Sequence, residues 1–287
     1  QGEVDAAGLR QLGRNGRLRN EHVHRVRQLH QLTSLTENAL GVLTLNVSNP
    51  PKARAADVLD WLWHTDEQVL VLTEVGRSAG SQLIEQVCRA AGFAVVATDR
   101  SELGVLVVGR GVAVRPTPAE PLAVLPGRVA PVLVAAGSSE LPVLGVYGAA
   151  SDPVRYASAA QRARKREWLA AYQAWLVDWF AAQGDCALVL GDLNIVDPLH
   201  TDPLPYVLHE ERDVYAALTG PLGLSDAYRA TDPTGAGVSW VDHTGVGCRY
   251  DHALTRGLAV TACRLDHEPR VARLTDHSAL RLRVGRP

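Results

Sequence analysis

The 287-residue sequence contains no methionine and only two phenylalanines. It also has no apolar run near the roughly 20 residues that a membrane-spanning helix requires, since the best candidates are Ala39 to Val47 and Val129 to Ala136. A membrane-spanning role is therefore excluded. Because methionine is absent, we expect an initiator residue to have been removed, together with any targeting segment that it carried.

The sequence has few cysteines, and none lies at a metal-binding or redox spacing. Cys88, Cys186, Cys248 and Cys263 form no CxxC or CxxxC pair, and the start of the sequence does not resemble a secretory signal. A disulfide framework is not indicated, and we expect a cytoplasmic protein. The motifs GxxxxGK and GxSxG are also absent, which argues against a nucleotide-binding P-loop and against covalent catalysis.

Lysine is nearly absent, because 27 of the 29 basic residues are arginine. Arginine suits phosphate through its planar fork, but the abundance of alanine, leucine, valine and glycine favours a GC-rich bacterial genome as the cause of the bias. With 46% hydrophobic residues, 21% charged residues and a net charge of −2, the composition is that of a globular protein. A near-neutral total neither requires nor excludes nucleic-acid binding, which depends on a local basic face.

The first 40 residues differ from the rest of the chain. They are rich in arginine and poor in apolar residues, and Val23, Val26 and Leu29 fall at the spacing of a helix from about Glu21 to Leu40. We expect this basic N-terminal extension, residues 1–40, to be a solvated helix packed on the core. An arm that follows a phosphate backbone is the alternative.

From Gly41 onward, short apolar runs alternate with helical segments, which predicts one α/β layered domain over residues 41–287. The predicted helices are Ala53 to Trp63, Gly80 to Ala91, Tyr156 to Ala182 and a segment near Arg212 to Leu218. The predicted strands are Val42 to Val47, Val69 to Thr73, Ala94 to Thr98, Gly104 to Val108, Val129 to Ala136, Leu141 to Tyr147, Ala187 to Leu190, Arg249 to Leu254, Ala259 to Leu265 and Ala279 to Val284.

Polar side chains lie at the ends of several of these strands, which is where open α/β sheets place ligand sites. One such residue alone is most often a cap, a turn former or a satisfied core residue. Their number and order carry the signal. They are Asn46, Glu74, Tyr147, Asp192, Asn194, Asp251, Asp276 and His277.

In this order, the residues resemble the endonuclease/exonuclease/phosphatase superfamily of metal-dependent phosphoesterases, over about Gly41 to Val284. The GDLN element and the terminal TDH are the most specific pieces. The stretch 222–254 is most similar to the exonuclease III and abasic-site endonuclease branch. The resemblance implies a four-layer α/β sandwich, in which two mixed β-sheets pack face to face with helices outside, and a divalent-metal-dependent phosphodiester hydrolase.

The resemblance places a metal ion at Glu74, with Asp276 joining it and Asn46 holding Glu74 or the metal shell. Carboxylate oxygens suit Mg²⁺ or Mn²⁺, and so sparse a set is what Mg²⁺ uses while it keeps several waters. No cysteine belongs to the set, which disfavours a structural zinc site. The expected cofactor is therefore Mg²⁺ or Mn²⁺.

The remaining residues fit phosphodiester hydrolysis, which needs a positioned water and help for the developing charge. By the resemblance, Asp192 acts as the general base, and Asn194 holds Asp192 and touches the phosphate. His277 donates to a phosphoryl oxygen as imidazolium and is oriented by Asp251. Tyr147 bonds the phosphate or stabilises the leaving oxygen. Since every position is filled, a noncatalytic binding module with the same fold is the weaker alternative.

Substrate contacts are expected at Trp240, Arg249, Arg162 and Arg166. The resembled enzymes place an aromatic residue near the substrate's sugar or base at the position of Trp240, although a core tryptophan is the alternative. Arg162 and Arg166 belong to a basic segment, Arg155 to Arg166, that either follows a phosphate backbone or is solvated. The aromatic residues beside it are expected to face the core.

Three positions depart from the resembled family. The polar or acidic residue expected two positions after Asn46 is Ser48, and the glutamine expected before Glu74 is Thr73. The polar residue expected shortly after Tyr147 is replaced by Gly148-Ala149-Ala150, which weakens a role in DNA repair. We still expect a nuclease that acts on DNA, either exonuclease III-like or abasic-site endonuclease-like. The alternative is a phosphodiesterase or phosphatase that acts on a small phosphate ester, a nucleotide or a lipid headgroup.

Overall fold

The computed structural model describes residues 39–137, 139–151, 158–201, 204, 207–235, 237–242 and 244–285. Residues 1–38 of the N-terminal extension and Arg155 of the basic segment lie outside these ranges. The first strand begins at Ala39, so the predicted helix cannot extend to Leu40.

Two six-stranded sheets form the domain, and each has one parallel pair among antiparallel neighbours. The first sheet has the order β13-β14-β1-β2-β4-β3, with β1 parallel to β2. The second has the order β5-β6-β7-β8-β12-β9, with β7 parallel to β8. The first contains β1 Ala39–Asn46, β2 Val69–Val75, β3 Ala94–Ala97, β4 Gly104–Gly109, β13 Ala259–Asp266 and β14 Ala279–Gly285. The second contains β5 Val114–Pro116, β6 Val129–Ala136, β7 Ser139–Tyr147, β8 Ala187–Asp192, β9 Ser225–Asp226 and β12 Asp251–Arg256.

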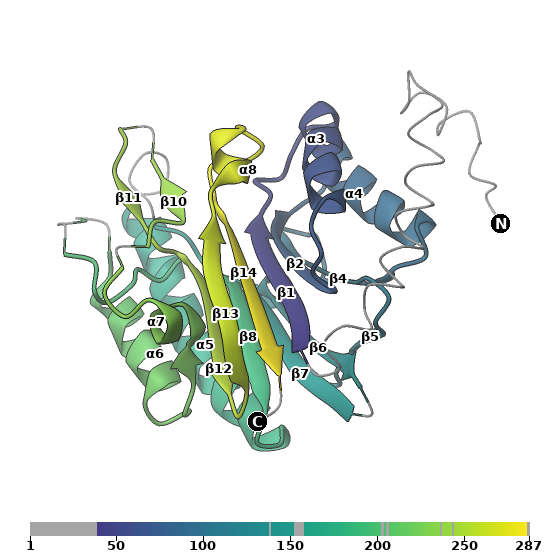
Figure 1. The fold of residues 1–287 in the computed structure, drawn as a ribbon. Helices are drawn as coiled ribbons and strands as arrows, with labels where there is room; N and C mark the ends of the chain where they lie inside the picture. The colour runs from purple at the N-terminus through teal and green to yellow at the C-terminus, as the bar shows by residue number, and fades with distance from the viewer. Residues whose placement is uncertain are drawn as a thin grey trace. The chain divides into compact units, whose positions relative to one another are not determined.

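Helices cover the two outer faces of this pair of sheets (Figure 1). Helices α3 (Lys52–Trp63) and α4 (Ala79–Ala90) pack on the first sheet, and α5 (Ala159–Ala182) and α6 (His209–Thr219) pack on the second. The short elements are the 3-10 helix η1 Pro126–Arg128, the helices α7 Ala227–Thr231 and α8 Glu268–Val271, and the hairpin of β10 Trp240–Val241 and β11 Gly247–Cys248. The arrangement is a four-layer α/β sandwich, as the sequence predicted.

Alternation along the strands decides which of three apolar layers a side chain joins, because successive residues point to opposite faces of a sheet. On β1, Val42 belongs to the core between the sheets, whereas Leu43 belongs to the core under α3 and α4. On β7, Val143 faces the other sheet, and Leu144 packs toward Trp168 of α5. Apolar residues therefore occupy both faces of these strands, which explains why the sequence shows them as continuous apolar runs.

Gly145 on β7 lies in close contact with valine side chains of the first sheet. A Cβ atom at this position would lie 2.9 Å from Val105 Cγ1 and 3.0 Å from Val71 Cγ1, both on the first sheet. No side chain fits there without moving one of the two valines. The spacing between the sheets at this point therefore depends on a missing side chain.

The predicted strands and helices of residues 41–287 are all present, with ends shifted by a few residues. The strands β5, β9, β10 and β11 were not predicted, because two or three residues are too few to show an alternation. The sequence also failed to predict α7 and α8, whose four or five residues span little more than one turn. In the part of the chain that the structure describes, no helix is long and apolar enough to cross a membrane.

Candidate active site

Three of the predicted catalytic residues are neighbours across the second sheet. Tyr147, the last residue of β7, lies opposite Asp192 of β8, and Asp192 lies opposite Asp251 of β12. On the first sheet, Asn46 ends β1 opposite Thr73, one residue before Glu74. The strand ends of both sheets therefore contribute to one site, as the sequence predicted from their order along the chain.

Glu74 leaves the regular strand at an irregularity in β2. The pairing of β2 with β4 shifts register between Thr73 and Val75, and Glu74 has a left-handed backbone with φ of 54°. A bulge of this kind redirects a side chain, and a non-glycine residue held at positive φ is typical of functional sites. Here it brings Glu74 Oε1 to 2.8 Å from the Tyr147 hydroxyl, which donates to it across the two sheets.

Asn46 connects three of the predicted residues through a single atom. Its Nδ2 lies 3.0 Å from Glu74 Oε1, 2.8 Å from Asp192 Oδ2 and 3.3 Å from His277 Nε2. Its Oδ1 accepts the backbone N–H of Ser48 at 2.8 Å. Because the amide nitrogen faces the carboxylates and the oxygen is used locally, this arrangement fits the role of holding Glu74 rather than that of a metal ligand.

Asp192 is buried and accepts two hydrogen bonds from Asn194, one from its backbone and one from its side chain. The backbone N–H of Asn194 donates to Asp192 Oδ1 at 3.0 Å, and its Nδ2 donates to Oδ2 at 3.1 Å. Burial raises the pKa of Asp192 to about 7; the charge of His277 opposes this shift, and the carboxylates of Asp251 and Glu74 add to it. A carboxylate of this pKa can accept a proton near neutral pH.

His277 is buried between two carboxylates. Its Nδ1 lies 2.7 Å from Asp251 Oδ2, and its Nε2 lies 3.9 Å from Asp192 Oδ2. Burial disfavours the imidazolium, but the charge and the hydrogen bond of Asp251 outweigh burial and raise the pKa of His277 to about 10. This pKa favours the charged imidazolium at neutral pH, and the role of His277 as a donor to phosphate stays a prediction.

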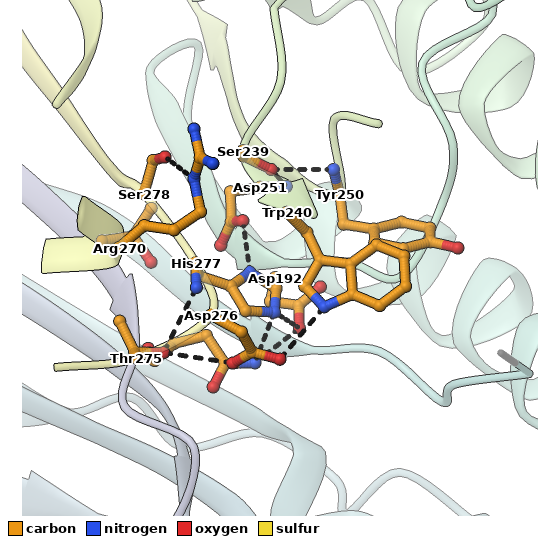
Figure 2. A network of polar contacts seen from close by, with 12 residues as sticks. Asp192, Ser239, Trp240, Tyr250, Asp251, Arg270, Thr275, Asp276, His277 and Ser278 are labelled. Carbon is orange, nitrogen blue, oxygen red and sulfur yellow. Dashed lines mark hydrogen bonds and ion pairs between the residues drawn. The ribbon is translucent and has the colours of Figure 1, made fainter. Parts of the chain in front are cut away.

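A pair of contacts outside this centre involves Trp240 and Asp276 (Figure 2). The indole Nε1 of Trp240 donates to Asp276 Oδ2 at 3.1 Å, and the Trp240 ring packs against Tyr250 with centroids 5.5 Å apart. Ser239 accepts the backbone N–H groups of Tyr250 and Asp251 on its Oγ, at 3.0 and 3.1 Å. These bonds attach the β10–β11 hairpin to the residues around His277, so Trp240 lies at the edge of the site.

The carboxylates of the site fit a divalent cation. Glu74 is half-buried and Asp276 is exposed. Asp192 lies near Glu74, because both carboxylates accept a hydrogen bond from Asn46 Nδ2. Burial and the neighbouring acids already raise the pKa of Asp192 to about 7, so a cation beside this group would relieve the charge. Among the described residues, no group of three or more histidine, cysteine, aspartate or glutamate side chains is arranged to hold a metal ion. A cation held here would therefore take most of its ligands from water.

Arg249 does not fit its expected contact with substrate. Its side chain is fully buried, and its guanidinium pairs with Asp226 Oδ2 and Asp197 Oδ2, each at 2.6 Å. It also stacks over the ring of Tyr228, 5.1 Å from the centroid. Two buried carboxylates satisfy this cation, so Arg249 holds the fold beside the site and is not available to a ligand.

The basic segment on α5 is mostly neutralised within the protein. Arg164 pairs with Glu102, Arg166 Nε lies 2.7 Å from Glu210 Oε1, and Lys165 is buried against Glu211. In the described part of the chain, Arg162 makes no ion pair. The aromatic residues of α5 face the core as expected, with Trp168 stacked on Tyr172.

The sequence did not identify Arg128 as a part of the site. Its guanidinium lies 4.0 Å from the centroid of the Tyr147 ring, and its NH1 donates to the carbonyl of Gly148 at 2.9 Å. The same carbonyl accepts Asn194 Nδ2 at 3.1 Å. Arg128 follows a Pro-Gly pair at the start of a strand, where one arginine among 27 gives no sequence signal.

Solved structures of an AP endonuclease, a 3′-5′ exonuclease and TDP2 share this fold. An AP endonuclease from Archaeoglobus fulgidus superposes with a TM-score of 0.66 at 19% identity, over 85% of this chain and 98% of that one. A 3′-5′ exonuclease, NExo, from Neisseria meningitidis gives 0.65 at 23% identity, over 85% and 98%. A D. rerio TDP2 humanized by 14 mutations gives 0.64 at 13% identity, over 87% and 100%.

The sequence alone yields no such match, since neither the scan against protein-family models nor the search of curated proteins finds a relative. The structural likeness rests on the arrangement of the sheets and helices. The chain shares the fold of these three structures, which confirms the four-layer α/β sandwich that the resemblance implied.

Proposed function

We propose that the protein is a divalent-metal-dependent phosphodiester hydrolase that acts on nucleic acid, with DNA as the favoured substrate. The observation that carries the proposal is the convergence of Glu74, Asp192 and His277 on the amide nitrogen of Asn46, within 3.3 Å. Two acids and a charged imidazole at one point supply a proton acceptor, a proton donor and a cation ligand.

Glu74 would hold Mg²⁺ or Mn²⁺, with Asp276 as the second carboxylate. The bound ion would neutralise charge on the non-bridging phosphate oxygens. Tyr147 keeps the Glu74 carboxylate in place: burial, with the adjacent Glu74 charge, raises the pKa of Tyr147 well above its ordinary value, so the hydroxyl stays protonated. Its single hydrogen is used on Glu74, so Tyr147 acts here by orienting that carboxylate.

The raised pKa values of Asp192 and His277 support their proposed roles as proton acceptor and hydrogen-bond donor. Asp192, with its pKa raised to about 7, can take the proton of an attacking water, and Asn194 orients it through two hydrogen bonds. His277 would donate from Nε2 to a phosphoryl oxygen, because Asp251 engages Nδ1. Each residue thus serves one proton transfer or one hydrogen bond.

The choice of nucleic acid is supported by the neighbours in structure space. A Neisseria NExo structure contains a product DNA hairpin, and a D. rerio TDP2 structure contains a single-strand DNA product. We propose the same class of substrate for this chain, with cleavage of the exonuclease III or abasic-site endonuclease type. Arg162 and Trp240 are the side chains proposed to meet the substrate, and Arg166 would have to exchange Glu210 for a phosphate.

One observation favours a second candidate, a phosphatase or phosphodiesterase of small phosphate esters. Three of the basic side chains on α5 are already paired with glutamates, so the helix offers little free positive charge for a long phosphate backbone. A small ester would need only the central residues. The two candidates share the same chemistry and differ in the size of the substrate.

The test is a substrate panel with Mg²⁺ and with Mn²⁺, in the presence and absence of EDTA. The panel contains duplex DNA with blunt, recessed, abasic and 3′-phosphate ends, RNA, mononucleotides and bis-p-nitrophenyl phosphate. We expect EDTA-sensitive cleavage of DNA that Asp192→Asn and His277→Ala abolish, while Asp185→Asn, at an exposed position before β8, retains it. Cleavage of small esters alone would select the second candidate. No turnover of any substrate would refute both.

A further inference from the structure

Lys165 lies within the basic segment of α5 but does not share the environment of its neighbours. It is 1% exposed, whereas Arg164 and Arg166 reach solvent. Its Nζ lies 2.7 Å from Glu211 Oε1 on α6 and 2.7 Å from the backbone carbonyl of Asn194, to which it donates. A third contact, to Ser151 Oγ, measures 3.2 Å. The ammonium group is thus fully engaged inside the protein.

Both carboxylate oxygens of Glu211 also have hydrogen-bond partners. Its Oε1 accepts the backbone N–H of Leu208 at 3.0 Å, at the start of α6, and its Oε2 accepts the backbone N–H of Val196 at 3.2 Å. The ion pair therefore contacts the chain that follows β8 at two points, the carbonyl of residue 194 and the amide of residue 196.

The segment between these points needs such support. Asn194 has a left-handed backbone with φ of 50°, which costs energy for a residue with a side chain. The segment forms no regular secondary structure, and its next anchors are also buried groups: His252 Nε2 lies 2.7 Å from the carbonyl of Ile195, and the N–H of Asp197 donates to the carbonyl of Arg249. Buried side chains and single backbone hydrogen bonds, rather than a regular sheet ladder, satisfy this backbone.

We infer that Lys165 and Glu211 are positioning residues that fix Asn194 against Asp192, and that Lys165 makes no contact with substrate. The two hydrogen bonds from Asn194 to Asp192 depend on the left-handed backbone at residue 194, and the Lys165 ammonium holds the carbonyl of that same residue. The expected change in kcat rests on the proposed function, whereas the fixing of Asn194 is argued from the contacts of Lys165 and Glu211.

The kinetic test compares three variants with wild type. Lys165→Met/Glu211→Met removes both charges at once, so that no single buried charge is left unpaired. We expect its kcat to fall about 10- to 100-fold, the usual effect of losing an outer support of a catalytic group, with KM and DNA affinity within about twofold of wild type. Lys165→Arg, which restores a cation, should recover most of kcat. Asp178→Asn, exposed on the far end of α5, is the matched control.

The opposite pattern would overturn the inference. If the double variant keeps its kcat and instead raises KM and lowers the salt dependence of DNA binding, Lys165 is a phosphate contact. If kcat, KM and affinity all stay within about twofold, the pair has no role in the reaction.

Amide hydrogen exchange separates this inference from the proposed function, because it needs no activity. In Lys165→Met/Glu211→Met, the amides of residues 194–197 should exchange at least about tenfold faster, while those of Leu188 and Leu190 in β8 remain protected. If the wild-type protein hydrolyses no substrate and the double variant still exchanges faster, the proposed function is refuted and the positioning role of Lys165 and Glu211 is supported. Unchanged exchange at residues 194–197 would refute the positioning role itself.

Discussion

Asp251 Oδ2 lies 2.7 Å from His277 Nδ1, and this contact joins β12 to the residues that precede β14 on the other sheet. The backbone reinforces the same junction, because the N–H of Ser278 donates to the carbonyl of Ser239 at 2.6 Å. The imidazole is thereby held with Nε2 toward Asn46 and Asp192.

Removing the charge of Asp251 should weaken catalysis without dismantling the fold. Asp251→Asn keeps the shape of the side chain but loses the carboxylate that orients and charges His277. We expect kcat to fall about 10- to 100-fold, measured by steady-state kinetics on the best substrate of the panel. Circular dichroism should match wild type, and a variant with unchanged kcat would show that His277 needs no orienting partner.

Glu74 should control cation affinity. Glu74→Gln retains an acceptor for Tyr147 and Asn46 but removes the negative charge, so we expect the dissociation constant for Mn²⁺ to rise at least about tenfold in titrations followed by electron paramagnetic resonance. The matched control is Glu120→Gln, at an exposed glutamate between β5 and β6. Equal Mn²⁺ binding by the two variants would remove Glu74 from the ligand set.

The buried cluster of Arg249 should govern stability in acid. Burial alone would raise the pKa of Asp226, but His252 and the Arg249 guanidinium outweigh it and hold this pKa well below its usual range. A carboxylate whose pKa is lower in the folded chain contributes stability above its unfolded pKa of about 4, and loses it as the pH falls toward the folded value.

Asp226→Asn should therefore cost about 1–3 kcal/mol at pH 7, because Arg249 loses one of its two carboxylate partners and keeps Asp197. Below about pH 4, the free energy of unfolding should fall less steeply with pH than in wild type. Urea unfolding at a series of pH values measures both effects, with the exposed Asp213→Asn on α6 as the control. A slope equal to that of wild type would contradict the assignment of the acid sensitivity to Asp226.

Gly148 should tolerate no side chain. A Cβ atom there would lie 1.8 Å from the carbonyl oxygen of Leu193, so Gly148→Ala must displace the backbone that leads to Asn194. We expect a loss of at least about 2 kcal/mol in unfolding free energy together with a lower kcat. Gly184→Ala is the control, because a Cβ at Gly184 would meet nothing within 4 Å. Similar melting temperatures for the two variants would contradict the close approach.

The sequence predicted that polar residues at strand ends would lie near one another, because strand ends of a layered α/β domain meet at a common edge. The structure brings Asn46, Glu74, Asp192 and His277 together in this way, and their catalytic roles stay predictions. It could not predict the burial of Arg249, since Asp197 and Asp226 lie 52 and 23 residues away along the chain. Lys165 was grouped with its arginine neighbours for the same reason, because its partner Glu211 belongs to another helix.

Backbone conformation was equally hidden from the sequence. The positive φ angles of Glu74 and Asn194 arise from a register shift in β2 and from buried anchors around the segment after β8, and neither cause is local. Apolar patterning therefore predicted an α/β layered domain, and the resemblance implied its four layers. The contacts that support the site side chains could not be predicted, because they join elements that are distant along the chain.

Because Gly145 has no side chain, the hydrogen-bond geometry of the site depends on apolar residues that take no part in it. Asn46 and Glu74 belong to the first sheet, whereas Asp192 and Tyr147 belong to the second. The Asn46–Asp192 and Tyr147–Glu74 hydrogen bonds, each of 2.8 Å, therefore depend on the gap between the sheets, which Gly145 shares with Val71 and Val105. A methyl group added at Gly145 would push the sheets apart and lengthen the hydrogen bonds that join them at the site, although Gly145 is not one of the site residues. Random mutagenesis of this protein should therefore yield some variants that fold but have no activity, although their substitutions lie in the apolar interior and not in the site.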